Sequence, residues 1–475
     1  MKTWKTNLEE TKQRYINWWN HKGIILSMWE HFQEGVKPHA DIAPPAPARD
    51  LSQKWFDPQW RAEYLDWYVA HSSLMADMLP VANTQLGPGS LAAILGGVFE
   101  GGEDTIWIHP DPNFNDEIVF NPEHPNWLLH KELLKACKAK ANGNYFVGMP
   151  DLMEGLDVLA ALKGTDMVLL DTVMQSEVLE QQMQQINDIY FKVFDELYDI
   201  IREGDEMAFC YFSSWAPGKM SKLQSDISTM ISQDDYRRFV QPFIREQCQK
   251  IDYTLYHLDG VGAMHHLPAL LEIEELNAIQ WTPGVGEPQG GSPKWYDLYK
   301  KILAGGKSVM ACWVTLDELK PLLDHIGADG VHLEMDFHNE KEVEQAMRIV
   351  EEYTGSSTAV NTNKHQQDAD LAATGQERIC IREEQHREED KLKPLYEAIV
   401  AGKLEPAVEI TRQAIAEGVA PQMIINNYMI KAMGEVGQRF QDGKAFVPQL
   451  LMAGRAMKGA LELLKPLLAG SASTT

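Results

Sequence analysis

Eight short apolar runs, separated by longer segments with helical periodicity, constrain the fold of the first 350 residues most. Runs that read as strands and alternate with helical segments are typical of a parallel sheet covered by helices. Eight of them predict an α/β fold, a (β/α)8 TIM barrel, whose functional side chains lie at the C-terminal strand ends. A doubly wound open sheet is the structural alternative. The eight runs are 23–31, 77–85, 144–151, 206–214, 252–260, 277–284, 307–314 and 329–335.

The composition changes after residue 355. Ser, Thr, Asn, Gln, Asp and Ala dominate the next twenty residues, which is typical of a flexible linker. Four helical patterns follow, separated by glycine and proline, and they predict a small all-α four-helix bundle. We therefore predict a TIM-barrel domain at 1–355, a linker at 356–380 and a helical domain at 381–470. The four patterns are 384–401, 404–417, 421–442 and 446–468.

Charge and cysteine content narrow the functional classes. The 475 residues carry a formal net charge of −26, without a lysine and arginine cluster, which disfavours nucleic acid and anionic membrane partners. No run of eighteen apolar residues occurs, and the N-terminus reads as a charged amphipathic helix rather than a signal peptide. Five scattered cysteines lack CxxC spacing. We expect a cytoplasmic protein with reduced thiols.

Two predicted strands end in residue types that bind metal ions. The run "YHLDG" contains His257 and Asp259, and "VHLEM" contains His332 and Glu334. Residues two apart on a strand point to the same face, so both pairs could face the barrel mouth. His257, Asp259 and Glu334 are suitable ligands for a catalytic Zn²⁺, and we predict that they form such a site. The alternative is that each histidine belongs to an ordinary hydrogen-bonded pair.

Two further segments are predicted to line the mouth. In "TQLGPGSLAAILGG", Gly87 and Gly89 lie between a strand and a helix, where glycine lets the backbone approach a ligand closely. In "FSSWAPGKMSKLQSD", Trp215, Lys219 and Asp226 follow the fourth strand. An aromatic ring and an acid there would suit a small, partly apolar substrate. A packing role for Trp215 is the alternative.

Motifs in the N-terminal part carry a resemblance to a known family. The sequences "GPGSLAAILGG", "VGMPDLMEGLDVLAALKG", "SDISTMISQDDYRRFVQPF" and "YHLDG" occur in that order. With them, the first 350 residues resemble the uroporphyrinogen decarboxylase superfamily, which includes corrinoid-dependent methyltransferases. The resemblance implies a TIM barrel that binds a small methylated substrate.

A second resemblance concerns the last 85 residues. The sequence "MGEVGQRFQDGKAFVPQLLMAGRAMKGALELLKPLL" is similar to the helical cap that precedes the cobalamin-binding Rossmann domain in methionine synthase and in corrinoid proteins of methanogens and acetogens. The resemblance implies that its long helix covers the upper face of a corrin ring. It also implies that Phe440 and Val447, with Met433, contact the cobalamin. In a plain helix bundle they would be core residues, whereas cap residues stay apolar and uncovered without the corrinoid.

The sequence departs from these families at two places. It ends at "SASTT" without an Asp-x-His-x-x-Gly motif for the lower cobalt ligand, so we expect a truncated form or a corrinoid-binding Rossmann domain on a separate corrinoid protein. Related methyltransferases that activate thiols carry His-x-Cys, whereas this chain has His257 and Asp259. A site of nitrogen and oxygen ligands is less suited to a zinc thiolate. We therefore expect an O- or N-methyl donor.

These observations predict a corrinoid-dependent methyltransferase that moves a methyl group from a small donor to cob(I)alamin. His257 and Glu334 would bind the metal or activate the leaving group, with Asp259 as ligand or proton donor. One alternative is a uroporphyrinogen-type decarboxylase, but its many substrate carboxylates require arginines, and the first-strand region "KGIILSMWEHFQEG" has none. Another is a non-catalytic corrinoid-binding protein. The oligomeric state and the identity of the donor stay open.

Overall fold

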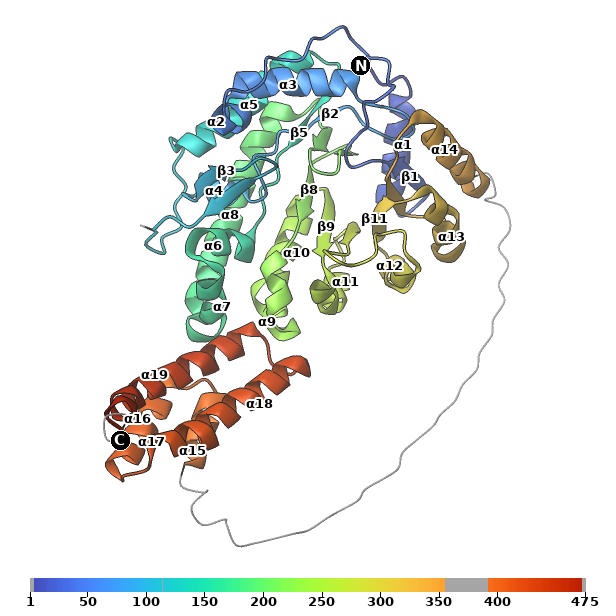
Figure 1. The fold of residues 1–475 in the computed structure, drawn as a ribbon. Helices are drawn as coiled ribbons and strands as arrows, with labels where there is room; N and C mark the ends of the chain where they lie inside the picture. The colour runs from blue at the N-terminus through green and yellow to red at the C-terminus, as the bar shows by residue number, and fades with distance from the viewer. Residues whose placement is uncertain (1–3, 113, 355–391, 472–475) are drawn as a thin grey trace, which may run out of the picture. The chain divides into compact units, whose positions relative to one another are not determined.

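The computed structural model describes residues 4–112, 114–354 and 392–471 (Figure 1). Its contacts divide the chain into two compact units, Met1–Ser357 and Thr358–Thr475. The predicted linker at 356–380, Cys380 and the start of the predicted helical domain lie outside the described residues. Within the described ranges, every helix is too short or too polar to cross a membrane.

A six-stranded parallel sheet forms one side of the N-terminal unit, with the strand order β1-β12-β11-β10-β9-β8. Its strands are buried almost throughout, as expected for a parallel sheet covered by helices. The strands are β1 (Ile24–Ser27), β8 (Met220–Leu223), β9 (Tyr253–Asp259), β10 (Ala278–Thr282), β11 (Ser308–Val314) and β12 (Val331–Met335).

A second sheet has the order β2-β5-β6-β7, formed by β2 (Val81–Ala82), β5 (Phe146–Met149), β6 (Met207–Phe209) and β7 (Ser214–Ala216). Its strands are parallel except for β6 and β7, which form an antiparallel pair. A separate hairpin joins β3 (Val98–Gly101) to β4 (Ile106–His109).

Each of the eight predicted runs contains a strand, so the α/β class with parallel sheets is confirmed. Two details of the strand prediction were wrong. The run at 206–214 holds β6 and only the first residue of β7, because the chain reverses between them. The strand β8 was not predicted, because "MSKL" contains a lysine and reads as a loop. Among the described residues the paired strands form two larger sheets and a separate hairpin rather than one ring, so the closed TIM barrel stays a prediction.

Helices lie around the outside of these strands (Figure 1). The helix α13 (Leu316–Ile326) begins at a capping box of Thr315 and Glu318, which pairs two otherwise unsatisfied backbone N–H groups. The remaining α-helices of this unit are α1 (Leu8–Trp19), α2 (Leu51–Phe56), α3 (Pro58–His71), α4 (Ser90–Ile94), α5 (Pro125–Ala141), α6 (Gly155–Lys163), α7 (Thr165–Met174), α8 (Ser176–Ile201), α9 (Gln233–Phe239), α10 (Gln241–Lys250), α11 (Leu267–Leu271), α12 (Tyr296–Ala304) and α14 (Glu340–Thr354). Three 3-10 helices complete it: η1 (Asp226–Met230), η2 (Val261–His266) and η3 (Pro293–Trp295).

The C-terminal unit is entirely helical where it is described. Its elements are α15 (Lys393–Val400), α16 (Leu404–Ala416), α17 (Pro421–Ile424), the π-helix η4 (Ile425–Met429), α18 (Ile430–Gln441) and α19 (Val447–Ser471). The elements α17, η4 and α18 follow one another directly, so they occupy the third predicted helical segment. A small core of Leu395, Ile399, Ile424, Met429 and Leu464 holds the helices together.

Candidate functional site

Three side chains at the carboxyl ends of neighbouring strands form a compact cluster. His257 and Asp259 lie at the end of β9, and Asp226 begins η1 shortly after β8. Ligand atoms of these three residues lie within 4.8 Å of one another, and they are a group of the kind that could hold a metal ion. The adjacent position of β8 and β9 in the sheet brings Asp226 to this place. We call Asp226, His257 and Asp259 the donor cluster.

The tautomer of His257 is set by its neighbour on β10. The Nδ1 atom of His257 is hydrogen-bonded to the side-chain oxygen of Gln280, and the Gln280 amide donates to Thr282 at 2.7 Å and to Cys312 Sγ at 3.0 Å. Because an oxygen accepts here, Nδ1 carries the hydrogen, and Nε2 keeps a lone pair. Burial and the Lys222 charge lower the pKa of His257 to about 3, so the ring is neutral.

The two acids of the cluster are held in an unfavourable setting for negative charge. Loss of surrounding water and the Asp157 carboxylate raise the pKa of Asp226 to about 8. Burial also raises the pKa of Asp259. Both carboxyl groups would ionise more readily beside a cation.

A buried polar network holds the loop before Asp226. Asp157 accepts hydrogen bonds from the backbone N–H groups of Asp226 and Ile227 at 2.8 and 2.9 Å. Lys222 forms an ion pair of 2.6 Å with Asp151, and both side chains are almost fully buried. The sequence alone does not predict a role for Asp151, Asp157 or Lys222. The signal was present, since "MPDLMEGLD" and "SKLQSD" place charged residues within otherwise apolar segments.

Glu334, the third predicted ligand, belongs to a different set of contacts. The thiol of Cys312 on β11 donates to Glu334 at 2.9 Å, and burial raises the pKa of Glu334 to about 8. The structure links Glu334 to His257 through Cys312 and Gln280, and it does not include Glu334 in the donor cluster. His332 is also separate from the cluster, because its Nε2 is 2.6 Å from Ser27 Oγ and its ring packs against Trp18.

A cavity of about 1030 Å³ in the same unit is connected to the donor cluster through one layer of aromatic side chains. The ring of Trp29 stacks on Trp313 with centres 5.1 Å apart and contacts Phe212, whose ring centre is 6.0 Å from that of His257. These contacts connect the cavity wall to the cluster. Tryptophan and tyrosine rings are the commonest large side chains in the lining, namely Trp29, Trp55, Trp60, Tyr64, Tyr68, Tyr211 and Trp313.

Local backbone distortions shape this wall. Trp313 has a positive φ of 54° and lies where the register between β11 and β12 shifts. Ser213, which also lines the cavity, has a φ of 45°. A left-handed backbone is costly for a non-glycine residue and is found preferentially at functional sites. A bulge of this kind re-aims a side chain, here Trp313 toward the cavity. Gly87 and Pro88 of the predicted mouth line it as well.

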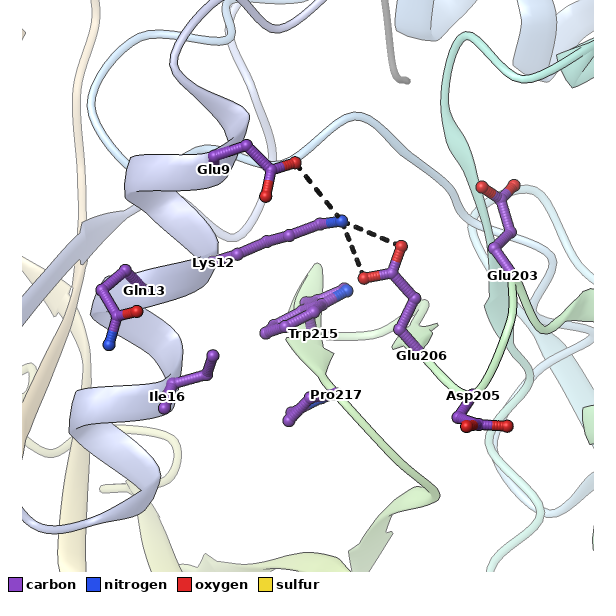
Figure 2. A pocket seen from close by; sticks show the side chains of 9 residues that line it. All are labelled: Glu9, Lys12, Gln13, Ile16, Glu203, Asp205, Glu206, Trp215 and Pro217. Atoms are coloured by element: carbon purple, nitrogen blue, oxygen red, sulfur yellow. Dashed lines mark hydrogen bonds and ion pairs between the residues drawn. The ribbon is translucent and has the colours of Figure 1, made fainter.

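Trp215 and Lys219, which were predicted to lie near the substrate, take part in other contacts. Figure 2 shows Trp215 in a smaller pocket of about 370 Å³ beside α1. There Lys12 lies 5.4 Å from the Trp215 ring centre and pairs with Glu206 at 2.7 Å and Glu9 at 3.7 Å. Lys219 pairs with Asp195. Of the three residues in this predicted group, only Asp226 joins the donor cluster, and Trp215 has the packing role given as the alternative.

The helical unit leaves apolar side chains uncovered on α18 and at the start of α19. Phe440 is 44% exposed and Ile430 is 53% exposed. Val447 is half-buried, and Met433 is half-buried against the core of the unit. Gly434 and Gly437 on the same helix have open space where a side chain would project. These apolar and small residues lie along α18 and at the start of α19, and we call them the α18–α19 face (Ile430, Gly434, Gly437, Phe440, Val447).

Comparisons with known proteins concern the C-terminal part of the chain. A family model described as "B12 binding domain" matches residues 392–465. Among curated proteins, monomethylamine corrinoid protein 1 of Methanosarcina mazei is 34% identical over 72 residues, which are 15% of this chain and 33% of the relative. Trimethylamine corrinoid protein 1 of the same organism is 39% identical over 62 residues, which are 13% of this chain and 29% of the relative.

A further relative, the dimethylamine corrinoid protein of Methanosarcina barkeri, is 35% identical over 85 residues, which are 18% of this chain and 39% of the relative. This chain thus spans about a third of the length of the curated relatives that it matches. The C-terminal helical unit carries a B12-binding domain that is homologous to part of the methanogen corrinoid proteins.

Proposed function

We propose that this protein is a corrinoid-dependent methyltransferase, in which the N-terminal unit binds a small O- or N-methyl donor. The observation that carries the proposal is the presence, in one chain, of a B12-binding domain and an α/β unit with a donor cluster and a large aromatic cavity. Of the two donor classes, O-methyl and N-methyl, the relatives named for methylamines support the N-methyl class.

The role proposed for the C-terminal unit rests on its exposed apolar surface. Phe440 and Val447, with Met433 behind them, would contact the upper side of a corrinoid. Apolar side chains exposed on one helical unit favour contact with a partner surface, and the match to a B12-binding domain supports a corrinoid as that partner. The corrinoid itself would be held by a Rossmann-type domain. The relatives are named corrinoid proteins, which supports such a partner.

The donor cluster fits a divalent metal ion such as Zn²⁺. His257 presents Nε2 with its lone pair, and Asp226 and Asp259 contribute carboxyl groups. The pKa values of both carboxyl groups are raised, and a bound cation would lower them. Three protein ligands with one open position are the usual arrangement of a catalytic zinc site. We therefore replace Glu334 by Asp226 in the proposed ligand set. When bound, the metal would supply Lewis acidity toward the leaving oxygen or nitrogen, and the corrinoid would supply the cobalt nucleophile.

The chain's own residues have positioning roles in this proposal. Gln280 fixes the tautomer of His257, and Asp157 fixes the backbone at Asp226. Trp29 and Trp313 stack on each other in the cavity wall and would orient the donor. Glu334 keeps its proton at neutral pH and is connected to His257 through Cys312 and Gln280. Most of the catalysis required of the protein is orientation of the donor.

A transfer assay tests the proposal. The full chain is mixed with a separately produced corrinoid protein in its cobalt(I) state and with a methylamine or an aryl methyl ether, and the corrinoid absorbance is followed. We expect methylation that is lost in His257→Ala and kept in His338→Ala, an exposed histidine outside the cluster. Glu334→Gln should lower turnover more than donor binding. Equal rates for His257→Ala and wild type, or release of CO₂ from a porphyrinogen, would contradict the assignment.

A further inference from the structure

The cavity contains one arginine, Arg61, whose guanidinium group has no acidic partner among the described residues. Arg61 lies on α3 and is only 7% exposed. Its side chain donates one hydrogen bond, from Nη2 to the Asn83 carbonyl oxygen at 3.1 Å. Its guanidinium group also lies over the Trp55 ring, whose centre is 5.3 Å from Cζ. A guanidinium group has five N–H donors, so most of its hydrogen-bonding capacity is unused.

A buried charge without a counterion is costly unless something else compensates it. Buried cations elsewhere in this unit are compensated. Lys222 has Asp151 at 2.6 Å, and Lys5 donates to the carbonyl oxygens of Leu74 and Ala76 at 2.9 and 3.0 Å. Arg61 differs from both, because it lines a cavity of about 1030 Å³ that a ligand could enter.

A second unsatisfied polar group lies in the same wall. His31 is buried, and its Nε2 atom has no hydrogen-bond partner. Burial and the charge of Lys5 lower the pKa of His31 to about 3, so the ring is neutral and can donate or accept one hydrogen bond. The acids in the lining, Glu30, Asp104 and Asp336, are all exposed. The buried part of the cavity is therefore positive, and its exposed part is negative.

We propose that this cavity binds a methyl donor that carries a single carboxylate group, with Arg61 as the residue that selects it. A planar guanidinium pairs with a carboxylate through two parallel hydrogen bonds, and the pairing is strongest in a buried setting. The aromatic lining suits a flat or apolar body for the rest of the molecule. The three exposed acids disfavour a polyanion. That the ligand is the methyl donor rests on the proposed function, whereas the carboxylate preference does not.

The test compares two probes of nearly the same shape, 4-methoxybenzoate and 4-methoxybenzamide, bound to the full chain without a corrinoid. Titration calorimetry should show roughly tenfold or more tighter binding of the carboxylate, the range expected for a charge-assisted pair. Arg61→Met should remove that preference. Lys54→Met, at the other cation in the lining, should keep it. Thermal unfolding followed by tryptophan fluorescence checks that each variant is folded.

Three outcomes would overturn the proposal. These are equal binding of acid and amide by the wild-type protein, absence of binding of both at millimolar concentration, and tighter binding of 4-methoxybenzylamine than of either. The wild-type comparison decides the question even if Arg61→Met fails to fold. If the protein prefers the carboxylate but transfers no methyl group, the proposed methyltransferase function is contradicted, whereas the proposed carboxylate site is still supported.

Discussion

Nε2 of His257 lies 4.0 Å from Oδ2 of Asp259, at the carboxyl end of strand β9. This separation is too long for a hydrogen bond. Two ligands of a tetrahedral ion, each about 2.0–2.2 Å from it, lie about 3.4 Å apart, so the pair would close by roughly 0.6 Å to bind one. Asp226 reaches the same place from the loop after β8. The three donors lie within 4.8 Å of one another, and Gln280 holds the histidine ring from its Nδ1 side.

We predict that purified protein supplied with Zn²⁺ binds about one ion per chain and that His257→Ala loses it. The reason is that Nε2 provides the only nitrogen ligand of the donor cluster. Metal content is measured after gel filtration. His338→Ala, which removes an exposed imidazole on the same unit, serves as the control. An unchanged zinc content in His257→Ala would remove this residue from the proposed site.

The second prediction concerns Glu334 and pH. Burial raises its pKa in the folded protein to about 8 from an ordinary value of 4.5. Between these two pH values the unfolded chain releases a proton that the folded chain retains. The free energy of unfolding therefore falls as pH rises through this window, by about 1.4 kcal/mol per pH unit for this group. In Glu334→Gln that contribution to the slope is absent.

Urea unfolding at pH 5.5, 6.5 and 7.5 measures this slope. All thirteen tryptophans precede residue 314, so their fluorescence reports on the N-terminal unit alone. Glu344→Gln makes the same chemical change at an exposed position of α14 and should keep the wild-type slope. If Glu334→Gln and Glu344→Gln show the same pH dependence, Glu334 does not hold its proton in the folded state.

The third prediction concerns the α18–α19 face. Phe440→Asp should weaken association with a cobalamin-loaded corrinoid domain by roughly tenfold or more, because a carboxylate would lose its water on binding. Leu467→Asp is a matched control, since Leu467 is 43% exposed against 44% for Phe440 and lies 20 residues beyond the start of α19. Both variants should unfold at the wild-type temperature. Equal weakening by the two substitutions would show that the face is not the contact surface.

Much of the secondary structure could be predicted from the sequence, since local rules determine it. The periodicity of apolar residues and the glycines at 402, 418 and 443 predict the helices of the C-terminal unit within a few residues, apart from its first helix, whose predicted start lies outside the described residues. All three glycines have positive φ, as helix ends require. The strand β8 was missed because Lys222 interrupts its apolar pattern, and only the tertiary structure supplies the Asp151 partner that lets a lysine be buried there.

The donor cluster was only partly predictable. The alternation of a strand shows that His257 and Asp259 share a face, and the structure brings them together. Alternation does not tell which other strand end lies beside them. Asp226, after the neighbouring strand β8, is the third member of the cluster. Glu334 lies on β12, which is separated from β9 by β10 and β11. Arg61 gave no signal in the sequence, because an unpaired buried charge is visible only once its surroundings are known.

The last prediction concerns the buried ion pair of Lys222 and Asp151, which supports the loop before Asp226. Lys222→Met leaves the Asp151 carboxylate without its cation, in a region that also contains the carboxyl group of Asp157. Breaking one side of a buried pair costs about 3–5 kcal/mol.

Lys219→Met is the control, because Lys219 forms a pair of the same length, 2.6 Å, with Asp195 near the surface. Exposed pairs contribute about 0–1 kcal/mol. Urea unfolding followed by tryptophan fluorescence gives both values. Asp151→Asn in the same chain should recover part of the loss, because it removes the unpaired charge. Equal costs for the two lysine substitutions would show that burial does not distinguish these pairs and that the network around Asp226 is held by other contacts.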